Sequence, residues 1–181
     1  QDGRFRILVQ HDGSQVPVDF RLNICPGQHG EDAVIRVLGS HHGMMEFNQL
    51  GIGKFEQEAL FRILSNPEGM FFVTGPTGSG KTTTLYAALS TLNNGTKKIV
   101  TAEDPIEYDL PKLTQKQVSN LLTYPVLARS FLRMDPDVML IGEVRDNLTA
   151  NAITRAASTG HLALSTLHTT DSFSTVVRLK S

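Results

Sequence analysis

One glycine-rich segment has the residue types and spacing of a phosphate-binding loop. Residues 75–82 read GPTGSGKT, which fits the pattern GxxxxGK[ST], and the apolar run Met70–Thr74 precedes them. Glycines at these spacings let consecutive backbone N–H groups turn toward phosphate oxygens, and the helix expected next adds the positive end of its dipole. Lys81 would neutralise the β- and γ-phosphates, and the Thr82 hydroxyl would ligate Mg²⁺. The nucleotide-binding residues predicted here are Gly75, Pro76, Thr77, Gly78, Ser79, Gly80, Lys81, Thr82 and Thr83.

Two acidic residues follow strand-like segments and could serve the same chemistry. The apolar run Val138–Ile141 ends in Gly142 and Glu143, so a buried strand would deliver this carboxylate to the carboxyl end of a sheet, where ligands of α/β proteins bind. There Glu143 could polarise an attacking water and hold Mg²⁺ through water. Glu103 opens the segment EDPIE after another strand-like run. It is either a second acid near the metal or part of a solvated turn.

Two histidines flank a further apolar segment. His161 precedes residues 162–166 and His168 follows them. A histidine at the far end of that strand could donate a hydrogen bond to a γ-phosphate oxygen and report its loss, while the alternative is a structural role for both rings. Their separation of seven residues, with no third ligand nearby, disfavours a metal site.

The pattern of apolar residues predicts two regions of different architecture. Alternating residues predict strands over 4–10 and 16–24 that form a hairpin, then a Pro/Gly loop over 25–30 and a third strand over 33–38. From residue 50 onward, helical and strand-like segments alternate, which is typical of βαβ units with a parallel sheet covered on both faces. The expected strands are 70–74, 98–102, 138–141 and 162–166, and the expected helices are 55–64, 85–92, 126–134, 148–157 and one beginning near 176.

We therefore expect three parts. Residues 1–42 would be the β-rich C-terminal part of a separate N-terminal domain, residues 43–49 a linker, and residues 50–181 an incomplete α/β core. The chain begins at Gln1 and ends inside an amphipathic pattern, so it is expected to be a fragment of a longer protein.

The composition excludes several other classes of protein. The 181 residues are 40% hydrophobic and 19% charged, with a net charge of −1, which does not suit a dedicated nucleic-acid or membrane-surface module. No apolar stretch approaches the roughly 20 residues of a membrane-spanning helix. The single cysteine, Cys25, allows neither an internal disulfide nor a cysteine-based metal site.

Four segments in this order resemble the secretion ATPase family, in particular the assembly ATPases of type II secretion and type IV pili. They are GMFFVTGPTGSGKTTTLYAAL (69–89), IVTAEDPIEY (99–108), FLRMDPDVMLIGEVRD (131–146) and STGHLALSTLHTTD (158–171). These are similar to the family's Walker A, Asp box, Walker B and His box. Residues 18–38 also resemble the end of its N-terminal domain.

The resemblance implies a RecA-type, Mg²⁺-dependent ATPase with Glu143 as the catalytic carboxylate and Glu103 as a second acid. His168, and with it His161, would sense the γ-phosphate, and Arg21 and Arg36 would reach toward the nucleotide. Arg129 and Arg133 resemble further family arginines, with a solvated basic face as the alternative.

The resemblance also implies partners and a location. It implies a homo-hexamer that powers pseudopilus or pilus assembly from the cytoplasmic face of the inner membrane, through platform proteins and without direct nucleic-acid contact. Secretion members often carry a four-cysteine zinc module beyond the His box, and this sequence is expected to stop short of that region. Tyr124-Pro125, Asp146-Asn147 and Cys25 depart from the family pattern. A binding-only assembly module and a nucleic-acid translocase remain the alternative functions.

Overall fold

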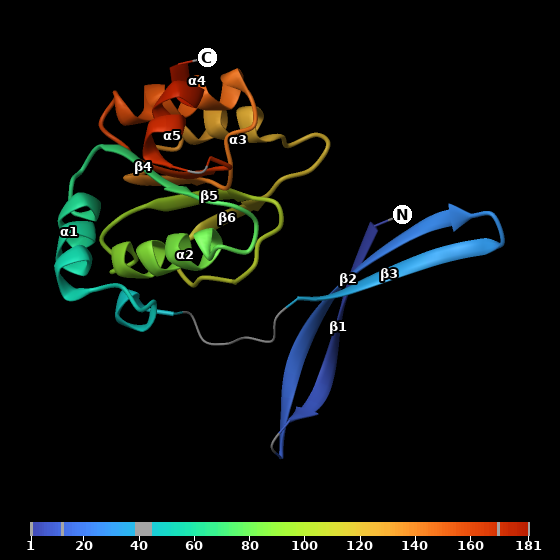
Figure 1. The fold of residues 1–181 in the computed structure, drawn as a ribbon. Helices are drawn as coiled ribbons and strands as arrows, with labels where there is room; N and C mark the ends of the chain where they lie inside the picture. Colours follow the sequence, from blue (N-terminus) through green and yellow to red (C-terminus); the bar gives the residue numbers. More distant parts are fainter. Residues whose placement is uncertain (1, 12, 39–44, 170, 181) are drawn as a thin grey trace. The chain divides into compact units, whose positions relative to one another are not determined.

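The computed structural model describes residues 2–11, 13–38, 45–169 and 171–180. The chain divides into two compact units, Gln1–Gly43 and Met44–Ser181 (Figure 1). The first two residues of the expected linker, 43 and 44, lie outside the described residues. Among the residues described, no helix combines the length and the apolar content needed to cross a membrane.

The first unit is an antiparallel sheet of three strands in the order β1-β2-β3. The strands are β1 (Asp2–His11), β2 (Ser14–Gly27) and β3 (Gly30–Leu38). The predicted hairpin is confirmed, because β1 pairs with β2 from Asp2↔Asn23 to His11↔Ser14. Phe5 and Phe20 face each other in this register with their rings stacked 5.1 Å apart.

The loop expected over residues 25–30 is shorter in the structure. Cys25, Pro26 and Gly27 belong to β2, and Gly30 already belongs to β3 with a φ of 141°. Only residues 28 and 29 turn the chain, which gives a two-residue hairpin. Among the described residues, β2 pairs with β1 only as far as Asn23, so the missing N–H of Pro26 costs no bond to that strand there.

The second unit is an α/β domain. Its helical elements are η1 (Phe47–Gln49), α1 (Lys54–Leu64), α2 (Lys81–Leu92), α3 (Tyr124–Phe131), α4 (Asn147–Ala157) and α5 (Ser172–Lys180). Its strands are β4 (Gly69–Thr74), β5 (Ile99–Glu103), β6 (Thr114–Gln117), β7 (Val138–Ile141) and β8 (Leu162–Leu167).

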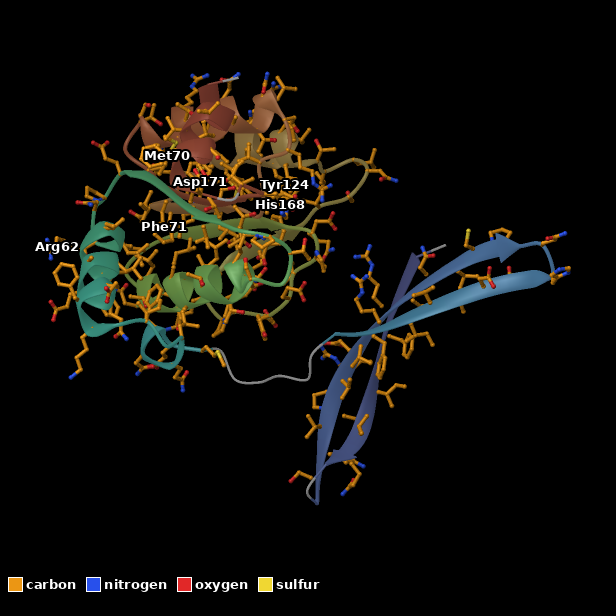
Figure 2. All side chains as sticks on the ribbon, viewed as in Figure 1. Arg62, Met70, Phe71, Tyr124, His168 and Asp171 are labelled. Carbon is orange, nitrogen blue, oxygen red and sulfur yellow. The ribbon has the colours of Figure 1, made fainter. Side chains whose placement is uncertain are left out.

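The five strands form one parallel sheet in the order β4-β8-β7-β5-β6, which confirms the predicted fold class. Helices α1 and α2 lie on one face and α3, α4 and α5 on the other (Figure 1). On β4, Met70 and Phe71 leave the strand on opposite sides (Figure 2). Phe71 packs into the core of the α1/α2 face and Phe72 into that of the other face.

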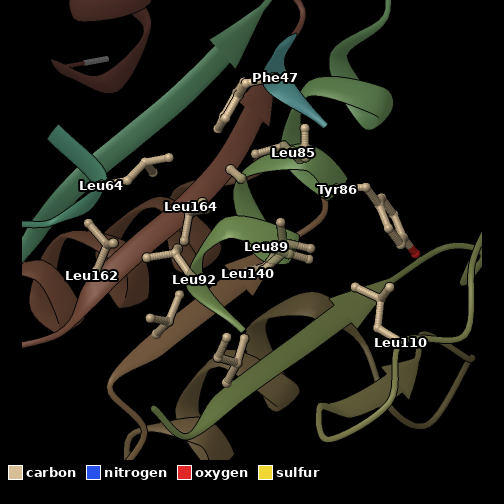
Figure 3. Close-up of a cluster of buried hydrophobic side chains, with 14 residues drawn as sticks. Phe47, Leu64, Leu85, Tyr86, Leu89, Leu92, Leu110, Leu140, Leu162 and Leu164 are labelled. Carbon is tan, nitrogen blue, oxygen red and sulfur yellow. The ribbon is translucent and has the colours of Figure 1, made fainter. Parts of the chain in front are cut away.

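Burial on both faces explains why the central strands are apolar throughout. In β7, Val138 and Leu140 belong to the core that packs against α2, while Met139 and Ile141 belong to the core against α3 and α4. The first core includes Leu64, Leu89 and Leu164 (Figure 3). Successive strand residues therefore fill two separate cores, as a sheet covered on both faces requires.

Three details differ from the sequence-based expectations. Strand β6 was not predicted, because its sequence TQKQ has no alternating apolar residues, and it pairs only with β5 at the sheet edge. Helix α3 ends at Phe131 rather than near Met134, since Asp135 has a φ of 52° and precedes a proline. Helix α5 begins at Ser172, where Asp171 Oδ1 accepts a hydrogen bond from the Ser174 amide.

Phe47, near the start of the second unit, is buried in the hydrophobic core of that unit. This residue falls within the expected linker, but it is 1% exposed and packs with Leu64 and Leu85. Its ring meets that of Phe61 on α1 edge-on at 5.6 Å.

Candidate active site

A cavity of about 460 Å³ opens at the carboxyl end of the parallel strands. It brings together segments that lie far apart in the sequence. The polar and charged residues in its lining are Thr77, Lys81, Thr82, Thr83, Tyr86, Glu103, Asp104, Glu107, Tyr124, Glu143, Arg145, Thr166 and His168. The carboxyl ends of all four predicted strands, or the loops that follow them, thus converge on one site, as the parallel topology dictates.

The phosphate loop has the backbone conformation that its sequence predicts. Gly75, Gly78 and Gly80 have φ values of 147°, 82° and 89°, which residues other than glycine rarely adopt. A Cβ at Gly75 would also lie 2.6 Å from Ser79 Oγ. The loop therefore needs glycine at these positions, and α2 begins directly after Gly80 with its N-terminus at the cavity.

Lys81 lies across the loop. Its Nζ donates to the carbonyl oxygens of Gly75 and Pro76 at 2.8 Å and 2.9 Å. Lys81, Thr82 and Thr83 all line the cavity, as do Thr77, Gly78 and Gly80. The ammonium group, two hydroxyls and the helix N-terminus together form a site suited to polyphosphate.

Glu143 is fixed at the end of β7 by bonds to both neighbouring strands. Just before it, the Gly142 amide donates to Ala102 O on β5 at 2.8 Å. On the other side, Thr166 Oγ1 of β8 donates to Gly142 O at 2.7 Å. These bonds hold the backbone that presents Glu143, whose side chain is 14% exposed.

The Glu143 carboxylate has a different neighbour at each oxygen. Arg145 Nη2 lies 2.5 Å from Oε1, and His168 Nε2 lies 3.6 Å from Oε2. The neighbouring carboxylate raises the pKa of Arg145, which therefore stays a cation. Arg145 was not predicted from the sequence, although a cation two residues after an acid at a strand end is a usable signal.

Glu103 lies in a buried hydrogen-bond network. It is 4% exposed and accepts hydrogen bonds from Tyr86 Oη, from Thr101 Oγ1 and from Gln115 Nε2, the last at 3.1 Å. Tyr86 Oη in turn accepts from the amides of Glu107 and Tyr108, both at 3.2 Å. The network joins α2 to the loop after β5, and burial together with the Glu103 charge raises the pKa of Tyr86.

The two predicted histidines lie at opposite ends of β8. His168 follows the strand and lines the cavity together with Tyr124, which is labelled near it in Figure 2. His161 precedes the strand, at the amino end of the sheet, where its Nδ1 lies 3.0 Å from Ala156 O and 3.1 Å from Thr159 Oγ1. Six strand residues, about 20 Å of chain, separate the two ends, so the structure does not bring His161 to this cavity.

The predicted arginines lie elsewhere in the chain. Arg21 and Arg36 are directly opposite each other on β2 and β3 of the first unit. Arg129 lies in the last turn of α3 and is exposed, and Arg133 lies past the end of that helix and is also exposed. Neither Arg129 nor Arg133 is among the residues that line the cavity.

Comparisons with known proteins agree on one family. All of residues 1–181 match the family described as "Type II/IV secretion system protein". The chain is 46% identical over 181 residues to type II secretion system protein HxcR of Pseudomonas aeruginosa. It is 45% identical over 181 residues to the type IV pilus assembly ATPase PilB of Myxococcus xanthus. Each alignment covers 99% of this chain.

A solved structure supports the same relationship. The pilus retraction motor PilT with bound ADP aligns with a TM-score of 0.78 and 34% sequence identity over 98% of this chain. The chain spans 38% of HxcR, 31% of PilB and 51% of the PilT chain.

Proposed function

The chain belongs to the family of type II/IV secretion system proteins, and we propose that it hydrolyses ATP to power the assembly of type II secretion pseudopili or type IV pili. The observation that carries this proposal is the single cavity in which the phosphate loop faces Glu143 and His168. The identity to PilB and the ADP-bound PilT neighbour support nucleotide use.

The geometry suits attack of water on the γ-phosphorus. Lys81 and the amides of the phosphate loop hold the phosphates, and Glu143 orients the water and takes up its proton. The new bond joins the water oxygen to the γ-phosphorus, and the bond from that phosphorus to the bridging oxygen breaks. ADP carries away the bonding electrons, and inorganic phosphate receives the proton in the end.

Mg²⁺ fits the donor set of the cavity. Thr82 offers a hydroxyl beside the phosphate site, and Glu143 offers a carboxylate that can bind through water. Within the described part of the chain, no group of three or more His, Cys, Asp or Glu side chains is arranged to hold a metal alone. Such a site suits Mg²⁺, which keeps several waters and relies on substrate phosphates. When bound, the ion would neutralise charge on the β- and γ-phosphates.

Glu103 and the arginines take supporting roles in this proposal. Glu103 lines the cavity and would act in the outer shell of the metal, held by Tyr86 and Gln115. Arg21 and Arg36 are like charges in opposite positions of a strand pair, an unfavourable arrangement that an anion would relieve. We propose that they contact bound nucleotide, and that His168 senses the γ-phosphate.

The larger assembly is also a proposal. The family relationship supports a homo-hexamer that acts on platform proteins at the cytoplasmic face of the inner membrane. The balanced charge of −1 argues against a nucleic-acid partner.

The test is phosphate release from ATP at increasing protein concentration, with and without a chelator of Mg²⁺. We expect hydrolysis that requires Mg²⁺, rises per molecule with concentration, and is not stimulated by DNA or RNA. Stimulation by nucleic acid would favour a translocase. ADP and ATP binding without any hydrolysis would favour an assembly module that only binds nucleotide.

A further inference from the structure

One largely buried tyrosine at the active site has a hydroxyl that opens to the cavity and makes no hydrogen bond with the described residues. Tyr124, the first residue of α3, is 8% exposed and lines the cavity with Glu143. Within the described residues its hydroxyl makes no hydrogen bond, whereas the Tyr86 hydroxyl contacts Glu103 and two backbone amides. Buried tyrosines usually pair their hydroxyl, so the partner of Tyr124 is expected to come from the contents of the cavity.

The position of the hydroxyl is set by the backbone next to Glu143. A Cβ at Gly142 would lie 2.9 Å from Tyr124 Oη and 3.2 Å from Ala102 O. Glycine at 142 therefore lets the phenol oxygen lie directly against the residue that precedes Glu143. The hydroxyl and the carboxylate are thus presented to the cavity from adjoining positions.

Burial and the charges around the phenol favour its neutral form. Burial contributes most, Glu143, Asp104 and Glu103 act in the same direction, and Arg145 opposes them. The result is a raised pKa for Tyr124, so at neutral pH its oxygen can both accept and donate a hydrogen bond.

We propose that Tyr124 is a further catalytic residue, whose hydroxyl holds the attacking water beside Glu143. The water would donate one hydrogen to the Glu143 carboxylate and the other to Tyr124 Oη, which leaves a lone pair directed at the γ-phosphorus. This inference rests on the proposed ATP hydrolysis. In this proposal the function depends on the Tyr124 hydroxyl, the one group that a phenylalanine at the same position would lack.

The test compares Tyr124→Phe with the parent chain in steady-state ATP hydrolysis. Loss of one hydrogen bond to the attacking water should lower kcat roughly three- to tenfold, with KM and ADP affinity within about twofold of the parent. Tyr108→Phe is the matched control, because its ring packs edge-on against Tyr86 at 5.0 Å and it is not part of the cavity lining. An unchanged kcat in Tyr124→Phe would overturn the inference, as would equal losses in both variants.

A binding measurement separates this inference from the proposed function. ADP with aluminium fluoride mimics the transferring phosphoryl group and its attacking water, and ADP alone does not. We expect Tyr124→Phe to weaken binding of ADP with aluminium fluoride about threefold or more and to leave ADP binding unchanged. If Tyr124→Phe and the parent chain bound ADP with aluminium fluoride equally well, the proposed role of Tyr124 would be overturned. A parent chain that binds nucleotide without hydrolysing it would instead contradict the proposed function.

Discussion

His168 Nε2 lies 3.6 Å from Oε2 of Glu143, the carboxylate oxygen that does not contact Arg145. The two residues come from the ends of β7 and β8, which are neighbours in the sheet. The carboxylate therefore lies between two nitrogen-bearing side chains of different character. Arg145 is a permanent cation, whereas His168 carries a charge only when protonated.

Arg145 should matter for turnover more than for nucleotide affinity. Arg145→Met removes the cation that lies 2.5 Å from Glu143 Oε1 and frees the carboxylate to rotate. Because Arg145 is 65% exposed at its side chain, we expect a moderate effect, a fall in kcat of roughly three- to tenfold with ADP affinity nearly unchanged. Steady-state hydrolysis and equilibrium titration with ADP measure the two quantities.

Arg155→Met is the matched control for that change. Arg155 lies in the last turn of α4 and is exposed, and it is not among the cavity residues. Equal kcat values for Arg145→Met and the parent chain would show that the ion pair does not orient Glu143.

Gln115 should contribute to folding stability through the Glu103 network. Its Nε2 donates to Glu103 Oε1 at 3.1 Å and to Tyr108 O at 2.9 Å, and its Oε1 accepts from the Leu110 amide at 2.8 Å. Gln115→Leu would leave these buried groups short of partners. We expect it to lower the free energy of unfolding by about 1–3 kcal/mol in urea titrations.

A second glutamine on β6 provides the comparison. Gln117 is exposed and its side chain accepts one long bond, 3.3 Å from the Ile106 amide. Gln117→Leu should therefore cost at most about 0.5 kcal/mol. If the two variants were equally stable, the network around Glu103 would not be a stabilising feature.

Alkaline pH should destabilise the fold through its buried tyrosines. The pKa values of Tyr86 and Tyr124 are raised above the ordinary 10.0. Above pH 10 the unfolded chain releases these protons while the folded chain still holds them. The unfolded state then binds fewer protons than the folded state. The contribution of these tyrosines to the free energy of unfolding is therefore complete below about pH 10 and is lost as the pH rises further.

Phenylalanine variants isolate this effect. Melting temperatures measured from about pH 8 to about pH 11 should fall less steeply for Tyr124→Phe than for the parent chain. A parallel fall in both proteins would assign the alkaline loss to other groups.

Much of the second unit was predictable because apolar periodicity sets strand and helix positions. Strand β7 was predicted with its observed bounds, since four apolar residues in a row suit a strand buried on both faces. Strand β6 was not predicted because it pairs with β5 through backbone hydrogen bonds, which leave no apolar pattern in the sequence. Its residue Gln115 makes a polar contact with Glu103 and does not fill an apolar core.

A motif names both Lys81 and Glu143, so their placement at the cavity was predictable from the sequence. The supporting residues of the site were not, because Tyr86, Gln115 and Tyr124 reach Glu103 or the cavity through the tertiary fold. His161 shows the converse. It shares a motif with His168, yet the direction of β8 places it at the other end of the sheet.

The most direct test of the account is the turnover of Glu143→Gln, because the glutamine keeps the shape but cannot accept a proton from water. We predict that this variant binds ATP with an affinity close to that of the parent chain and hydrolyses it at least about 100-fold more slowly. The measurement is phosphate release in a single turnover with Mg²⁺ present, alongside equilibrium binding of ATP. Hydrolysis at the parental rate would contradict the assignment of Glu143 as the residue that activates the attacking water.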